Sequence, residues 1–435
     1  MSTYLFASIP VPAHTTNPIP FAQRLIERGH TVLWYAGRAF HPQLAAIGAV
    51  PLALEAAEDF GGVEFEKHFP QFAGLTGVKA IKTAFADVFV GEALPRVADL
   101  HRIVAQYDVD AMLCDELMYG VGLTSELTGI PWATFGDGPL PYFEPDTPPF
   151  GPGLSPMRGP VGRLRNRAVG WIARNVLFAE AQRRYDAARA ELDLPEAERP
   201  VLEESVSPYL HLHGAVPSFD YPRKQLPSHM HWVGALRPDT PTNWQRPDWW
   251  TEVTTSVKPV VLVSQGSIRP DLTELVEPAI RALADVDVLV VVTTGQADPL
   301  DLEHAYGDPL PANLRVAKFV PYDQLLPHVS CFVTNGGYTG VTLALHHGVP
   351  LVQAGTTEEK AEIGARIEWT GVGVKLGTTR PSIEALRHSV ELVLSEERYA
   401  VAAGRVRAEM AEHDAGREGA DLLERLVVKT LEPQR

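Results

Sequence analysis

Two stretches of the chain alternate short apolar runs with segments of helical periodicity, and this alternation limits the possible folds more than any other feature. In the first stretch, residues 4–10 (YLFASIP), 19–29 (IPFAQRLIERG) and 30–37 (HTVLWYAG) predict a strand, a helix and a strand, and Gly29 is placed to end the helix. The same rhythm resumes over 260–369. Repeated β-α-β units are typical of parallel sheets covered by helices. The sequence therefore predicts an α/β protein with two doubly wound parallel sheets.

A polar, proline-rich stretch separates the two alternating regions. Residues 237–259 lie between two apolar runs, as is typical of a connection between domains. Residues 137–165 are rich in proline, glycine and aromatic side chains, which predicts a binding loop or a mobile cover. We expect an N-terminal domain over 1–236, a linker over 237–257 and a C-terminal domain over 258–435. An amphipathic terminal helix over about 416–432 could pack back on the N-terminal domain.

The net charge and the cysteine content limit what the protein can bind and whether it contains disulfides. The 435 residues include 38 Lys and Arg against 54 Asp and Glu, and the formal charge of -16 repels polynucleotides and anionic membranes. Cys114 and Cys331 lie in apolar runs and do not suggest a disulfide framework. The sequence has no signal-peptide pattern and no window approaching the ~18 apolar residues of a membrane span. We expect a cytoplasmic protein that binds small molecules, without nucleic acid or stable membrane insertion; no feature predicts its oligomeric state.

A histidine and several carboxylates follow strands of the first predicted sheet. His14 comes directly after the first strand, at the edge where such sheets bind ligands. A histidine there can take a proton from a hydroxyl near neutral pH, although a surface or helix-capping role is the alternative. Asp115 ends another apolar run and would orient the imidazole, unless it only caps the next helix. Glu116 and Asp137 are weaker candidates for the same orienting role.

Two glycine turns follow strands of the second predicted sheet. Gly266 and Ser267 come after one strand, where the glycine lets a ligand approach the backbone and the hydroxyl can bind a phosphate oxygen. Residues 334–340 (TNGGYTG) combine a glycine turn with the start of a helix, yet contain no Lys, Arg or His. Each turn alone could be an ordinary β-α connection. Together they predict an anion cradle for one diphosphate.

Two pairs of histidines have the spacing of metal ligands. His211 and His213 lie two residues apart on a predicted strand and so share a face, and His229 and His231 repeat the arrangement. No Asp or Cys at ligand spacing accompanies either pair. The sequence therefore predicts no metal site.

Five segments stand in a distinctive order along the chain. They are AHTTNP (13–18), SQGS (264–267), FVPYDQLLP (319–327), TNGG (334–337) with LALHHGVPLV (343–352), and the acidic pair at 358–359. This order resembles the family 1 glycosyltransferases of the GT-B fold, in the bacterial macrolide and natural-product branch, over nearly the whole chain. The resemblance implies two Rossmann-like domains facing across a cleft. It also implies an inverting, metal-independent transfer of a sugar from a UDP-type or dTDP-type nucleoside diphosphate sugar to an acceptor hydroxyl, with no further cofactor.

The resemblance assigns roles to individual residues. His14 would be the general base and Asp115 would orient it, while helix N-termini would receive the leaving diphosphate. The implied donor residues are Gly266, Ser267, Asn335, Gly336, Gly337, Thr339 and Gly340 for the phosphates, Phe319, Val320 and Tyr322 for the nucleobase and ribose, and Glu359 and Lys360 for the sugar.

The chain departs from the family pattern at this donor site. Asn335 replaces a phosphate-binding His, and Leu343 replaces the Glu that holds the ribose. Thr339 stands where the family has Asn, and Gly340 stands where it has Ser. Tyr322 and Lys360 each stand where the family has Gln. The cradle keeps hydrogen-bonding groups but loses a charge-assisted contact worth about 1.5–3 kcal/mol, unless Lys360 or a neighbour replaces it. The identity of the nucleotide stays open.

Aromatic residues of the first domain suggest the nature of the acceptor. Tyr142, Phe143 and Phe150 lie in the proline-rich loop, and Phe85 and Phe89 lie in a nearby apolar segment. They suit a lipophilic acceptor such as a macrolide, polyketide, flavonoid or steroid, or else they are core and lid residues.

Other functions remain open beside glycosyl transfer. A non-catalytic relative of the same fold would bind a lipophilic molecule or act as an auxiliary protein. A sugar epimerase of the same fold would need a different set of carboxylates. The joint presence of His14 and Asp115 favours the transferase.

Overall fold

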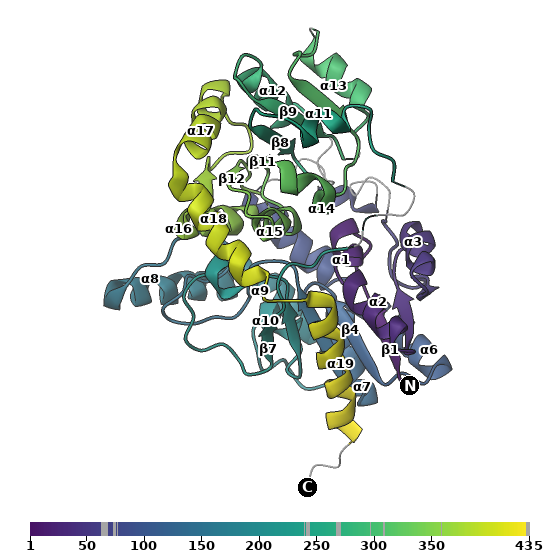
Figure 1. The fold of residues 1–435 in the computed structure, drawn as a ribbon. Helices are drawn as coiled ribbons and strands as arrows, with labels where there is room; N and C mark the ends of the chain where they lie inside the picture. The colour runs from purple at the N-terminus through teal and green to yellow at the C-terminus, as the bar shows by residue number, and fades with distance from the viewer. Residues whose placement is uncertain are drawn as a thin grey trace.

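The computed structural model describes residues 1–61, 68–72, 75, 77–238, 240, 244–266, 271–295, 297–307, 309–357 and 359–431, and it contains two parallel sheets. In Figure 1 the first sheet belongs to the purple, blue and teal part of the chain, and the second sheet, in the green part, lies above it. The first sheet has the strand order β3-β2-β1-β4-β5-β6-β7. Its strands are β1 (Thr3–Ala7), β2 (Thr31–Tyr35), β3 (Val50–Leu52), β4 (Ala111–Asp115), β5 (Trp132–Gly136), β6 (His211–His213) and β7 (Met230–Trp232).

Every neighbouring pair in this sheet is parallel, with β1 between β2 and β4. Strands β4 and β5 are buried at every residue, as expected when helices cover both faces. The α-helices of this half are α1 (Pro12–Thr16), α2 (Ile19–Glu27), α3 (His41–Ala46), α5 (Gly77–Thr83), α6 (Ala93–Gln106), α7 (Tyr119–Thr128), α8 (Gly159–Ile172), α9 (Ala179–Glu191) and α10 (Val201–Glu204). Short 3₁₀ or π segments lie at η1 (Arg38–Phe40), η2 (Pro70–Phe72), η3 (Ala84–Phe89), η4 (Ala173–Leu177) and η5 (Pro217–Phe219).

The second sheet is also parallel throughout, with the strand order β10-β9-β8-β11-β12-β13. Its strands are β8 (Val260–Ser264), β9 (Leu289–Thr293), β10 (Leu314–Ala317), β11 (Cys331–Thr334), β12 (Leu351–Gln353) and β13 (Gly373–Lys375). The helices of this half are α11 (Trp250–Thr254), α12 (Val276–Leu283), α13 (Pro299–Tyr306), α14 (Tyr322–Leu325), η6 (Leu326–His328), α15 (Tyr338–His346), α16 (Lys360–Thr370), α17 (Ile383–Ser395), α18 (Glu397–Met410) and α19 (Ala415–Leu431). The fold is thus the expected pair of doubly wound α/β units.

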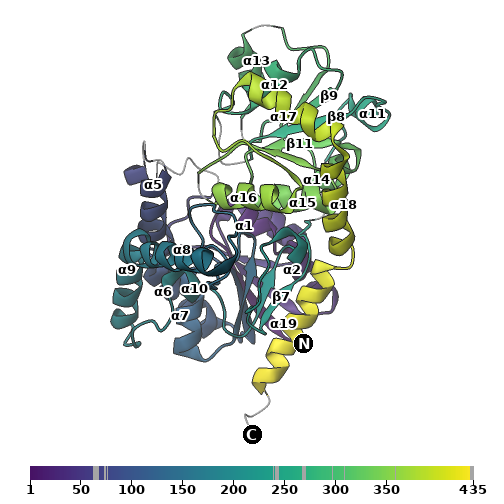
Figure 2. The ribbon, with the colours of Figure 1, turned by 90° about the vertical axis from the view of Figure 1, so that its left-hand side faces the viewer.

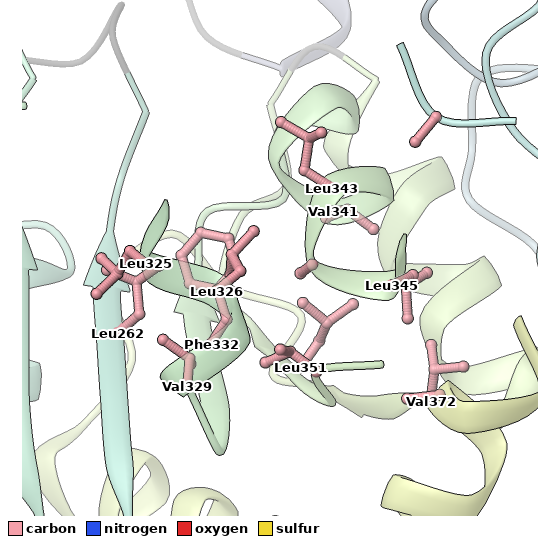
Figure 3. Close-up of a cluster of buried hydrophobic side chains, with 14 of the residues drawn as sticks. Leu262, Leu325, Leu326, Val329, Phe332, Val341, Leu343, Leu345, Leu351 and Val372 are labelled. Carbon is pink, nitrogen blue, oxygen red and sulfur yellow. The ribbon is translucent and has the colours of Figure 1, made fainter. Parts of the chain in front are cut away.

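One apolar cluster fills one side of the second sheet. Leu262 and Phe332 on neighbouring strands meet Leu326 and Leu345 from the covering helices (Figure 3). The same cluster includes Val216 and its neighbours, which follow β6 of the first sheet. The two halves therefore share one buried apolar core where they meet.

The terminal helix α19 leaves the second half and packs on α2 of the first, as Figures 1 and 2 show from two sides. Leu423 is fully buried in the core that also contains Phe21. A Cβ atom at Gly419 would lie 2.4 Å from the Phe21 ring, so the absence of a side chain allows this close approach. Arg28 adds ion pairs to the helix, including one of 2.7 Å to Asp421.

The predicted linker contributes to the second core. Within it, α11 buries Trp250 and Val253 among the apolar residues of that cluster. The aromatic and proline-rich stretch also runs into regular structure, because α8 begins at Gly159. Within the described residues, no helix combines the length and the apolar character needed to cross a membrane.

A buried ion network joins the two halves. Arg366 of α16 donates from Nε to Asp220 Oδ1 at 2.7 Å, and Arg223 donates to the other oxygen of Asp220 at 2.7 Å. Glu362, also on α16, accepts from Arg366 and from the backbone N–H of Gly153 at 2.7 Å. Burial alone would raise the pKa of Asp220, but the two arginines outweigh burial and hold that pKa well below its ordinary value. Asp220 is therefore an anion that holds two cations at the junction.

We predict that Asp220→Asn destabilises the protein by about 3 kcal/mol, because it leaves two buried guanidinium groups without their shared anion. The folded pKa of Asp220 is depressed, so its contribution to stability is complete above the ordinary carboxylate range and is lost as the pH falls. Urea unfolding at pH 7 and at about pH 2.5, below the ordinary carboxylate pKa, measures both effects: the difference between variant and parent should be larger at pH 7.

Asp285→Asn is the matched control. Asp285 pairs with Arg387 on the surface, so its loss should leave the unfolding midpoint unchanged. Equal effects of the two substitutions would contradict a stabilising role for the buried network.

Candidate active site between the two sheets

His14 lies in α1, directly after β1, and its Nδ1 atom faces two carboxylates. Asp137 Oδ2 is 3.4 Å away and Asp115 Oδ1 is 3.6 Å away. Asp115 ends β4 and Asp137 follows β5. In the sheet, β4 lies beside β1, and β5 lies on the other side of β4. The parallel order thus brings together the three side chains expected from the sequence. Asp137, the weaker candidate of the two, is the nearer one.

Burial and charge set the protonation of this group. Asp115 is fully buried and accepts backbone hydrogen bonds from Ile9 and Leu117, at 3.2 and 2.8 Å. Burial raises the pKa of Asp115, and the nearby His14 lowers it by less. Burial lowers the pKa of His14, but Asp137 and Asp115 raise it by more, so the pKa lies above its ordinary 6.5. The site therefore favours a proton on the imidazole.

Asn17 connects this group to the second half. Its Nδ2 donates to Asp137 Oδ2 and to Thr339 Oγ1, both at 2.9 Å. Thr339 is in the first turn of α15, where the sequence predicts a phosphate contact. Asn17 lies in the AHTTNP segment, but no feature of the sequence indicates this role. Its partner Thr339 is 322 positions away, so no local pattern indicates the contact.

The glycine turn before α15 has the conformation expected of an anion cradle. Gly336 has φ +94°, and a Cβ atom there would lie 2.7 Å from Gln353 Nε2. Gly337 is the N-cap of α15, and no side chain caps the helix. Gly340 lies in the first turn against the ring of Tyr322. The uncapped N–H groups at this end of α15 suit a negative group.

Asn335 ties the two predicted turns together. Its Nδ2 donates to the backbone oxygen of Gln265, and Gly266 next to it has φ +80° and lies against the Asn335 side chain. A pocket at this point is lined by Asn335, Gln265, Gly355 and Lys360, among others. Two of the implied donor residues, Asn335 and Lys360, therefore line one pocket together with Gln265, the neighbour of Gly266. Ser267 lies outside the described residues.

Glu359 brings the second half close to His14. It is the N-cap residue of α16, and burial raises its pKa while His14 lowers it. Glu359 in turn raises the pKa of His14. The residue implied for the donor sugar thus interacts with the residue implied as general base.

The residues implied for the nucleobase and ribose differ in exposure. Phe319 is 57% exposed and could present its ring to a base, whereas Val320 is buried. Tyr322 packs edge-on against Phe332 with ring centroids 5.6 Å apart. Leu343 is buried in the core cluster (Figure 3), so the position where the family holds the ribose supplies no polar group.

The phenylalanines proposed for the acceptor lie in the interior. Phe85 in η3 is buried, with ring centroids 5.3 Å from Phe89 and 4.9 Å from Phe178. Phe89 is partly buried and packs against the same cluster. The core interpretation left open by the sequence describes Phe85 better than an acceptor contact does.

The aromatic residues of the proline-rich loop are held by the first half. The hydroxyl of Tyr142 lies 2.9 Å from His211 Nδ1. Phe143 lies under the guanidinium of Arg174 at 4.7 Å, and a Cβ atom at Gly170 would be 2.6 Å from its ring. Phe150 is partly buried beside the cluster that contains Phe85. In this structure the loop is packed against α8 and β6.

A polar group beside the site was not predicted. Glu116 Oε1 lies 3.0 Å from His211 Nε2, and His213 Nε2 lies 3.0 Å from the hydroxyl of Tyr338 at the start of α15. Glu116 follows β4 and the two histidines form the ends of β6, so the contact crosses the sheet. Two features of the sequence indicated parts of this group: the position of Glu116 at the end of a strand and the shared face of His211 and His213.

Comparison with known proteins places the chain in a family. Residues 277–426 match the family described as "Erythromycin biosynthesis protein CIII-like, C-terminal domain". The 4'-demethylrebeccamycin synthase of Lentzea aerocolonigenes is 42% identical over 424 residues, covering 97% of this chain and 99% of that protein. UDP-glycosyltransferase 2 of Phaeomoniella chlamydospora is 32% identical over 438 residues, covering 97% and 95%.

The fold agrees with a solved structure. The glycosyltransferase VinC in complex with dTDP superposes with a TM-score of 0.71 at 18% identity, covering 98% of this chain and 100% of that one. From the long alignments above 30% identity and from this fold, we conclude that the chain belongs to the family 1 glycosyltransferases of the GT-B fold, in their natural-product branch.

Proposed function

We propose that this glycosyltransferase moves a sugar, with inversion, from a UDP-type or dTDP-type nucleoside diphosphate sugar to a hydroxyl of a lipophilic small molecule. His14 is the general base and no metal takes part in the transfer. The observation that carries the proposal is the position of His14, with two carboxylates at Nδ1 and Glu359 of the other half close by.

The geometry suits a base that gains a proton during the reaction. With Nδ1 turned to Asp137 and Asp115, the other ring nitrogen, Nε2, is the atom that can take the acceptor proton. The two carboxylates stabilise the imidazolium that forms, at the moment when charge develops. The acceptor oxygen then forms its bond to the anomeric carbon as the bond from that carbon to the diphosphate breaks on the opposite face.

The start of α15 suits the leaving diphosphate. Gly336 and Gly337 open the backbone there, and the helix dipole favours the negative charge that the leaving group gains. Asn335 offers no charge, and its amide is already engaged with Gln265. Lys360, one of the two residues implied for the sugar, lines the same pocket as Asn335 and carries a positive charge. We therefore assign it the missing charge-assisted contact.

The class of donor and acceptor is inferred from relatives. VinC was solved with dTDP and the fungal relative is named a UDP-glycosyltransferase, which supports a pyrimidine nucleotide in this chain. The name of the Lentzea aerocolonigenes relative, a synthase of 4'-demethylrebeccamycin, supports a natural-product acceptor. A non-catalytic relative of the same fold stays the competing interpretation, and the nucleotide measurement below separates the two.

We predict that UDP or dTDP raises the thermal unfolding temperature more than GDP or ADP does. A ligand at 100 times its dissociation constant adds about 2.7 kcal/mol of stability. Differential scanning fluorimetry of the full chain with the four nucleotides measures this. If none of them shifts the transition, the donor site does not work and the non-catalytic interpretation is favoured.

We predict that His14→Gln lowers kcat by about 10²- to 10⁴-fold, the usual contribution of a general base, while the nucleotide shift persists. Chromatography with mass detection can follow transfer from UDP-glucose or dTDP-glucose to a panel of macrolide, polyketide, flavonoid and steroid aglycones. His388→Gln on α17, an exposed histidine, is the control and should keep full activity. Equal activity of both variants would exclude His14 as the base.

We predict that kcat/KM falls on the acidic side with an apparent pKa above 6.5, because the base must be neutral to accept a proton and its pKa is raised. Asp137→Asn removes the largest raising influence and should move this limb to lower pH. Initial rates between pH 5 and pH 9 measure this acidic limb in the parent and in the variant. A limb that does not move in the variant would mean that another group titrates.

A further inference from the structure

We propose that Glu116, His211 and His213 form a binding site for one divalent transition-metal ion of the Zn²⁺ class, which braces the first sheet against the start of α15. The site is separate from the transfer chemistry proposed above. It rests on three donor atoms that converge on one point of the backbone.

The point of convergence is Gly136, the last residue of β5. A Cβ atom built there would lie 2.5 Å from His213 Nδ1, 2.7 Å from Glu116 Oε1 and 2.7 Å from His211 Nε2. These atoms lie within 4.8 Å of one another. Strand β5 separates β4 from β6 in the sheet. Only because residue 136 lacks a side chain can Glu116 reach across β5 to the histidines.

The three donor atoms are buried and none of them makes a hydrogen bond of normal geometry, although Glu116 Oε1 and His211 Nε2 face each other at 3.0 Å. His211 is 0% exposed and His213 is 1% exposed, so water does not satisfy them from bulk solvent. Unpaired buried polar atoms are costly, and three of them directed at one place call for a shared partner. A metal ion satisfies all three at once.

The other ring nitrogen of each histidine has a partner that fixes the ring. His211 Nδ1 lies 2.9 Å from the hydroxyl of Tyr142, and His213 Nε2 lies 3.0 Å from the hydroxyl of Tyr338. With the ring N–H donating to each tyrosine oxygen, the free nitrogens Nε2 and Nδ1 keep lone pairs directed at Glu116. Such outer hydrogen bonds usually orient metal-binding histidines.

The donor set indicates the class of ion. Two imidazoles and one carboxylate suit Zn²⁺ and similar first-row ions better than Mg²⁺ or Ca²⁺, which prefer oxygen ligands. Ligand atoms around tetrahedral Zn²⁺ stand about 3.3 Å apart, which His211 Nε2 and Glu116 Oε1 at 3.0 Å nearly match.

The consequence concerns the junction of the two halves. Through His213 and Tyr338 the ion would be linked to the first residue of α15, the helix that we assign to the diphosphate. The ion would thereby hold the carboxyl ends of β4 and β6 and the donor helix in one arrangement.

The test measures metal directly and does not depend on turnover. The full chain, purified without a histidine tag and stripped with a chelator, is titrated with ZnCl₂ by calorimetry and by thermal unfolding, and with CoCl₂ by visible absorption. We expect about one equivalent of Zn²⁺, a higher unfolding temperature and a tetrahedral Co²⁺ spectrum. Glu116→Gln and His211→Gln should each weaken Zn²⁺ binding at least tenfold.

His231→Gln is the matched control. His231 lies on β7 opposite Leu212, so its side chain points to the other face of the sheet from His211 and His213. This variant should bind Zn²⁺ like the parent. Circular dichroism checks that each variant is folded.

Two results would overturn the proposal. The first is a parent protein that neither binds Zn²⁺ or Co²⁺ nor gains stability from them, which would leave Glu116 and His211 as a proton-sharing pair. The second is unchanged Zn²⁺ binding by Glu116→Gln and His211→Gln, which would place the ion elsewhere.

Discussion

The structure depends on one constraint, that parallel strands can be joined only by crossovers, so that every connection after a strand emerges at the same edge of its sheet. All strand pairs in both sheets are parallel. His14, Asp115 and Asp137 therefore gather at one edge although they are far apart in sequence. The second sheet gathers Gly266, Gly336 and its neighbours at its own edge in the same way.

The contact between the two edges is polar where the site lies and apolar around it. Asn17 bonds Thr339 across the junction, and the buried Asp220 holds Arg223 and Arg366. The apolar cluster shared by both halves keeps water away from these ions. In such surroundings each charge alters the protonation of its neighbours, which is how carboxylates can hold the pKa of the partly buried His14 above its ordinary value.

The sequence predicted the candidate site unevenly, and the reason is physical. A residue that comes directly after a strand, such as His14 or Asp115, has its position set by the local pattern and the parallel topology. The direction of a side chain depends on what it packs against. Phe85 therefore lies in the core, and Tyr142 bonds His211 where an acceptor contact was expected. The histidine pair on β6 has no carboxylate at ligand spacing in its own stretch of sequence, and the fold brings Glu116 beside it from the end of β4.

The sequence by itself determined the two parallel α/β units, the family, and the strand ends that carry the polar residues. These follow from local periodicity, glycine placement and the order of short segments. Only the tertiary structure decided that Asp137 lies nearer His14 than Asp115 does, that Asn17 links Asp137 to Thr339 of α15, and that Glu116 reaches His211 over Gly136. Each of these contacts joins residues on different strands or different halves, so it depends on distances in space that no local pattern records.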